Sequence, residues 1–164
     1  MPDPSTAKVS DLDFLAQAPF KMVFSDTLDC TPERAFAVLA DVDTWKHWFK
    51  DCKGCEWDTP APHDVGSQRT IHLLLMRVTE RIVAFEPGQR FAFAVTHNTA
   101  PVTKRMVENL ALTAVAGQTR VDWTVAYEPS LLVKLAHPVA RLVFGRMFRQ
   151  SLAGLKRFTR PAGV

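Results

Sequence analysis

The sequence predicts an α+β fold in which a curved antiparallel sheet of about seven strands wraps around a long C-terminal helix. Apolar residues alternate with polar or small ones in several segments that turn residues separate. Two short helical segments follow the first of these strands, and one long amphipathic segment ends the chain. A sheet with one apolar face must cover it, and the final helix is the only predicted element large enough to do so.

The first strand is predicted from the alternation in FKMVF (20–24). Thr31 can cap a helix and Pro32 suits its first position, so a helix is expected over Glu33–Ala40. A second short helix follows, because aromatic residues spaced three and four apart share one helical face: Trp45, Trp48 and Phe49.

From Cys52 onward the pattern is that of strands. EPGQ (86–89) and AGQ (116–118) mark turns, and a loop is expected over His97–Pro101. The turn between residues 73 and 78 cannot be placed, because LLLM (73–76) holds no Gly, Pro or Asn. Strands are expected over residues 52–57, 67–77, 78–85, 91–95, 106–112 and 121–127.

The final helix is predicted from Pro138 to about Phe158, and it is amphipathic. Its apolar face comprises Phe144, Met147, Phe148, Leu152, Leu155 and Phe158. The opposite face is basic, with Arg146, Arg149, Lys156, Arg157 and Arg160. No acidic residue follows Glu128, so this face could meet an acidic partner. Nucleic acid is not expected, because no aromatic residues interleave with the arginines, and neither is stable membrane insertion.

The chain length of 164 residues suits one domain, expected over residues 20–160 after an N-terminal arm over residues 1–19. The arm lacks the basic-then-apolar pattern of a secretion signal, and no apolar run is long enough to span a bilayer. We therefore expect a soluble, cytoplasmic protein.

The order of elements resembles the helix-grip fold of the START-like (SRPBCC) superfamily, and within it the polyketide cyclase/dehydrase and lipid-transport group. Four stretches carry the resemblance: CTPERAFAVLADVDTWKHWF (30–49), VTERIVAFEPGQRFAF (78–93), GQTRVDWTVAYEP (117–129) and SLAGLKRF (151–158). The resemblance implies an apolar cavity between sheet and terminal helix that binds a hydrophobic small molecule. Some relatives cyclise or dehydrate polyketides, and others carry lipids, sense ligands or assist partner proteins.

Three functions follow from this resemblance and from the charge pattern. The first is binding or carrying a hydrophobic small molecule or lipid. The second is a polyketide cyclase or dehydratase acting in the same cavity, and the third is a protein-interaction module using the basic helix. Whether the chain is an enzyme stays open, and no cofactor is expected. The residues expected to line the cavity are Trp48, Phe49, Phe93, Val95, Glu108, Leu110, Trp123, Val125, Phe144, Met147 and Phe148.

Alternation along the strands places three polar residues on the same face as these apolar ones: Glu108, His97 and Tyr127. A carboxyl group facing an apolar cavity has a raised pKa and can act as a general acid or base. Ring closure needs such a base together with a donor for the developing oxyanion. We assign no catalytic residue, and these three are the candidates. The loop beside His97 favours an exposed histidine over a catalytic one. Arg69, His72 and Glu80 lie on strands of uncertain register, where a slip of one residue reverses the facing.

The segment DCKGCEWD (51–58) places two cysteines at the spacing of zinc and redox motifs. A redox pair needs its first cysteine at a helix N-terminus, whereas this pair enters a strand. On a regular strand Cys52 and Cys55 point to opposite faces, and only a turn would let them share zinc with His47 and His63. No metal site is therefore expected, and one of the two cysteines packs as a small hydrophobe.

Overall fold

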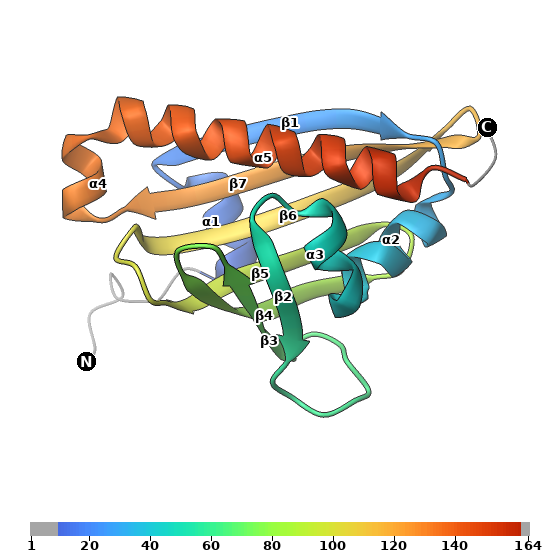
Figure 1. Ribbon diagram of the computed structural model, residues 1–164, viewed down its shortest axis with the longest axis horizontal. Coiled ribbons are helices and arrows are strands. Elements are labelled where there is room, and N and C mark those ends of the chain that lie inside the picture. Colours follow the sequence, from blue (N-terminus) through green and yellow to red (C-terminus); the bar gives the residue numbers. More distant parts are fainter. Residues whose placement is uncertain (1–9, 162–164) are drawn as a thin grey trace, which may run out of the picture.

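The computed structural model describes residues 10–161, which contain a seven-stranded antiparallel sheet in the order β1-β7-β6-β5-β4-β3-β2 (Figure 1). The predicted α+β architecture is confirmed. The strands are β1 (Phe20–Leu28), β2 (Cys52–Trp57), β3 (Gln68–Leu73), β4 (Arg77–Glu86), β5 (Arg90–Asn98), β6 (Thr103–Val115) and β7 (Gln118–Pro129).

The helices pack against the faces and one end of this sheet. They are α1 (Asp11–Gln17), α2 (Pro32–Ala40), the 3-10 turn η2 (Val42–Thr44), α3 (Trp45–Trp48), α4 (Leu131–Leu135) and α5 (His137–Thr159). In the described part of the chain, no helix is long and apolar enough to cross a membrane.

The long helix α5 runs across the inner face of the sheet, as predicted (Figure 1). Its C-terminal half contributes the buried side chains Phe148, Leu152 and Leu155. The ring of Phe148 lies 5.7 Å from that of Phe24 on β1 and 5.3 Å from that of Trp123 on β7. The other residues assigned to the apolar face are partly buried against the same core: Phe144, Met147 and Phe158.

Helices α2 and α3 close one end of the sheet. The Thr31 hydroxyl accepts a hydrogen bond from the Arg34 N–H at 3.3 Å, and Pro32 occupies the first turn of α2. On α3, Trp45 is fully buried and its indole N–H donates to the Leu39 carbonyl at 2.9 Å. The aromatic face predicted for this segment is therefore directed into the core.

Helices α3 and α5 approach each other closely at Gly154. A Cβ atom at this position would lie 2.2 Å from the carbonyl oxygen of Trp48. The contact therefore requires glycine. Gly145 on the same helix has more room, because a Cβ there would meet only the flexible side chain of Arg149, at 3.5 Å.

We expect Gly154→Ala to lower the free energy of unfolding by about 1–3 kcal/mol, because the α3 backbone must move away. Gly145→Ala is the matched control on the same helix. It should raise the free energy of unfolding by about 0.5–1 kcal/mol, since alanine is the better helix former and the site has space. Urea denaturation measures both, and equal effects would contradict the close contact.

The hairpin whose tip could not be placed from sequence turns at residues 74–76. The Leu73 N–H donates to the Met76 carbonyl at 2.8 Å and closes the turn. Leu75 stands at the tip with 92% of its surface exposed. Leu73 and Met76 are directed inward, toward the cavity described below.

The cysteine pair lies on β2, the edge strand, but the prediction of opposite facing is wrong. A β-bulge between Cys52 and Gly54 turns both cysteines toward the core. Burial raises the pKa of both thiols, that of Cys55 to about 12, so neither is activated. Within residues 10–161, no group of three or more His, Cys, Asp or Glu could hold a metal ion. The two histidines considered as zinc ligands stack on aromatic rings: His47 on Phe158 and His63 on Trp57.

Residues 11–17 of the expected N-terminal arm form helix α1, which packs on the outer face of the sheet. Asp11 accepts hydrogen bonds from Arg81 at 2.6 Å and from Arg105 at 2.9 Å. Residues 1–9 of the expected arm lie outside the described residues. The buried anchor of α1 is Phe14, which packs with the outward-facing residues Ala94, Val107 and Ala126.

Candidate functional site

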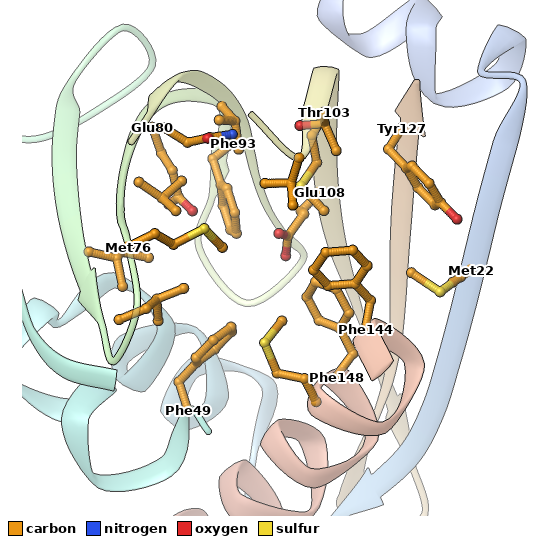
Figure 2. Close-up of a pocket in the computed structure, with 18 of the residues that line it drawn as sticks. Met22, Phe49, Met76, Glu80, Phe93, Thr103, Glu108, Tyr127, Phe144 and Phe148 are labelled. Carbon is orange, nitrogen blue, oxygen red and sulfur yellow. The ribbon is translucent and has the colours of Figure 1, made fainter. Parts of the chain in front are cut away.

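A cavity lies between the inner face of the sheet and the N-terminal half of α5 (Figure 2). The centre of a water molecule can occupy about 60 Å³ of it, and the whole unfilled region, open mouth included, is about 730 Å³. Ligand sites commonly occupy about 300–1,000 Å³. The 60 Å³ open to water lies well below this range, so side chains that project inward must move before a small molecule fits.

Methionines make up much of this wall. Met22 of β1, Met76 of the β3–β4 turn, Met106 of β6 and Met147 of α5 all line the cavity. Met1 is the chain's only other methionine. Because methionine is unbranched and adopts many rotamers, this wall can change shape. The cavity can therefore admit ligands larger than the space that it leaves open.

A buried ion pair joins β3 and β4 beside the cavity. Arg69 donates from Nε to Glu80 Oε2 at 2.9 Å, and neither side chain is more than 4% exposed. The guanidinium also lies 4.0 Å from the centroid of the Trp45 ring. Burial raises the pKa of Glu80, and the adjacent Arg69 charge opposes that rise. Since arginine stays protonated in proteins, Glu80 is the carboxylate that neutralises it.

Removing one partner of this pair should be costly. We expect Glu80→Gln to lower the free energy of unfolding by about 3–5 kcal/mol, because the Arg69 charge stays buried without compensation. The double variant Arg69→Met/Glu80→Gln should lose much less, since it buries no charge. A double-mutant cycle by urea unfolding measures the coupling, and strictly additive losses would contradict it.

Glu108 on β6 is the second buried carboxyl group, with 5% of its surface exposed. Figure 2 shows the carboxyl group directed into the cavity, toward the rings of Phe144 and Phe148. Its Oε2 accepts a hydrogen bond from the Trp123 indole N–H at 2.9 Å. Burial, and after it the negative charge of Glu80, raise the pKa of Glu108 to about 8. At pH 7 Glu108 is therefore mostly protonated and can donate a hydrogen bond into the cavity.

This raised pKa predicts a pH-dependent stability. Between about pH 5 and pH 8 the folded protein keeps the Glu108 proton while the unfolded chain releases it, so raising the pH favours unfolding. The wild type should lose a few kcal/mol of unfolding free energy over this interval relative to Glu108→Gln. Urea unfolding at several pH values measures the difference. Glu86→Gln, at an exposed position, is the control and should follow the wild type.

Two further polar groups border the cavity. The Tyr127 hydroxyl shares a hydrogen bond with His137 Nε2 at 2.9 Å, which joins β7 to the start of α5. Asn98 Oδ1 is buried and has no hydrogen-bond partner among the described residues. It is therefore free to accept a hydrogen bond from a ligand.

Seven of the eleven residues predicted to line the cavity do border it: Phe49, Phe93, Val95, Glu108, Phe144, Met147 and Phe148. The other four lie in the packed core instead: Trp48, Leu110, Trp123 and Val125. Strand parity identifies an inward-facing residue but not its position along the strand. The Trp123 ring lies 5.3 Å from Phe148 and 6.3 Å from Trp48, so aromatic packing fills that end of the inner face.

Strand parity alone would direct His97 inward, whereas its place beside a loop favours exposure. His97 is exposed and pairs with Thr79, while Glu80 pairs with Val95, which leaves Thr96 as the extra residue of a β-bulge. The bulge reverses the alternation, so the next residue, Asn98, borders the cavity in place of His97. Of the three candidate catalytic residues, the structure therefore brings Glu108 and Tyr127 to the cavity and not His97.

Sequence reasoning missed Glu80, Asn98 and three of the four methionines, Met22, Met76 and Met106, as lining residues. Arg69 and Glu80 face each other across β3 and β4, but their register depends on a turn that no Gly, Pro or Asn marks. The alternation along their strands did place Met22 and Met106 on the inward-facing side of the sheet. This alternation was the sequence signal that could have identified them as lining residues.

A family model described as polyketide cyclase/dehydrase and lipid transport matches residues 19–158. The chain belongs to this family. An uncharacterized protein of Mycobacterium tuberculosis is 29% identical over 151 residues, which cover 90% of this chain and 89% of that protein. The Zhui aromatase/cyclase from Streptomyces sp. R1128 superposes with a TM-score of 0.74 at 17% identity, covering 88% of this chain and 98% of that chain.

A START superfamily protein from Mycobacterium smegmatis superposes with a TM-score of 0.73 at 10% identity, covering 85% of this chain and 96% of that chain. At such identities the solved structures show the fold alone. The predicted membership of the polyketide cyclase/dehydrase and lipid-transport group is confirmed, and the solved structures show that the chain has the START-like fold. The family and the apolar cavity together support the binding of hydrophobic ligands in general.

Proposed function

We propose that the protein binds or carries a hydrophobic small molecule or lipid in the cavity between the sheet and α5. The observation that carries the proposal is the composition of the wall. Four flexible methionines and several aromatic rings surround one protonated carboxyl group. An apolar wall supplies affinity, and a few fixed polar groups orient the ligand.

The polar groups favour a ligand with an uncharged oxygen-bearing head group. Protonated Glu108 can donate a hydrogen bond to a carbonyl or hydroxyl oxygen, and Asn98 Oδ1 can accept one from a hydroxyl. A carboxylate head group would meet the negative charge of Glu80, which also borders the cavity. The proposed ligand is therefore a neutral alcohol or ketone with a long apolar body.

The test uses N-phenyl-1-naphthylamine, an uncharged fluorescent probe, and its displacement by 1-dodecanol or dodecanoate. Dodecanol should displace the probe at the lower concentration. Met147→Trp fills the cavity and should weaken probe binding by about tenfold or more. The control is Leu142→Trp, which alters an exposed residue of the same helix. If Met147→Trp and the wild type bind the probe equally, the cavity is not the site.

Glu108 also favours a second candidate, a cyclase or dehydratase acting on a polyketide-like substrate. A carboxyl group with a pKa of about 8 can take and return a proton near neutral pH. Ring closure removes a proton from an activated carbon and delivers one to the carbonyl oxygen that is attacked. A carrier releases its ligand unchanged, whereas this enzyme would convert a poly-β-ketone into a cyclised product. The variant Glu108→Gln should then still bind the substrate but no longer turn it over.

A further inference from the structure

Exposed leucines cluster around the mouth of the cavity. Two stand on the β3–β4 turn and three on α4, and their exposed fractions run from 59% to 92%. Isolated exposed apolar residues are ordinary, but clusters of them mark interaction surfaces. We call this cluster the apolar rim: Leu74, Leu75, Leu131, Leu132 and Leu135.

The rim is continuous with the cavity. Met76 follows Leu75 in the turn, Val133 lies between Leu132 and Leu135 on α4, and both Met76 and Val133 line the cavity. The loop between β5 and β6 adds Val102 to the same wall. In Figure 1 the β3–β4 turn, this loop and α4 all lie toward one end of the molecule, away from the C-terminal end of α5.

The rim continues along the outward face of α5. The exposed residues Val139, Leu142 and Val143 stand at helical spacing within α5. The N-terminal half of α5 is therefore apolar on two faces, inward at Phe144 and Met147 and outward at these positions. The prediction of a single basic outer face is correct only for the C-terminal half.

Positive charge lies on α4 and along the adjoining start of α5. A groove between β1 and α5 gathers Lys21, Arg141 and Arg149, and no carboxylate lines it. Lys134 stands exposed on α4 itself. Within residues 10–161, no carboxylate lies at ion-pair distance from these four cations, whereas Glu128 is paired with Lys104 at 3.3 Å.

We propose that the apolar rim docks onto an anionic lipid bilayer, so that the mouth of the cavity opens against the membrane surface. Leucines on a short turn and a short helix can enter the headgroup region, while the lysine and arginines around them meet lipid phosphates. The charge pattern complements such a surface, and the position of the rim gives an apolar ligand a path out of water. That path rests on the proposed function, whereas the docking itself does not.

The test is flotation with vesicles of phosphatidylcholine and phosphatidylglycerol, compared with phosphatidylcholine alone. The protein should bind the anionic vesicles, and added salt should weaken the binding. Leu75→Asp and Leu132→Asp should each weaken it by about tenfold, since each places a negative charge in the interface. Val65→Asp is the matched control: Val65 is comparably exposed but lies on the loop between β2 and β3, so its change should have no effect.

Charge reversal tests the electrostatic part. Lys134→Glu and Arg141→Glu should each weaken vesicle binding by about fivefold or more. Arg157→Glu, at the opposite end of α5, should leave it unchanged. An equal loss from Arg157→Glu would show a general attraction of the basic protein to anionic vesicles and would overturn docking through the rim. Failure to bind anionic vesicles at low salt would also overturn it. So would a result in which the protein binds no vesicles but binds an acidic protein, and Leu75→Asp abolishes that binding.

Binding of N-phenyl-1-naphthylamine without vesicles separates this proposal from the proposed function. Leu75→Asp and Leu132→Asp should bind the probe like the wild type, because both residues are exposed. If the wild type binds the probe but no vesicles, docking is wrong and the ligand-binding proposal survives. If it binds vesicles through the rim but no probe, docking survives and the ligand-binding proposal fails.

Discussion

The contact between Gly154 and the Trp48 backbone is the constraint on which the rest of the structure depends. It holds the C-terminal half of α5 against α3, and the aromatic residues gathered there fill one end of the inner face. Toward the start of α5, the side chains that meet the sheet are Phe144 and Met147, both only partly buried. The cavity is the part of the inner face that this packing leaves incompletely filled.

Two buried carboxyl groups lie near one buried cation, and burial is the main cause that raises the pKa of Glu108. Arg69 is neutralised by Glu80, with which it shares a hydrogen bond of 2.9 Å. Glu108 contacts the neutral indole N–H of Trp123 instead, at 2.9 Å. Ionising Glu108 as well would leave a net negative charge in a dry region, which is unfavourable. Glu108 therefore presents a neutral carboxylic acid to the cavity, and covering it with an apolar ligand costs less than covering a carboxylate.

Most of the fold could be predicted because periodicity, caps and turn residues agree along the chain. The departures from parity at His97 and Cys55 have one cause: a β-bulge inserts a residue and reverses the facing. Gly54 marks the bulge in β2, whereas no glycine marks the one at Thr96. The cavity wall could be predicted only in part, because parity gives the face of the sheet but not the place along it. Trp123 and Glu108 share the inner face, yet one is packed and the other borders open space.

The start of α5 extends the apolar rim. Its exposed residues there are Val139, Leu142 and Val143, whereas basic residues stand exposed from Arg146 onward. Releasing an apolar ligand into water costs about 0.8 kcal/mol for each exposed methylene group. A mouth seated in lipid headgroups, as we propose, avoids that cost because the ligand passes from one apolar environment to another. The clustered leucines thus form a continuous path from Leu75 through Met76 into the cavity.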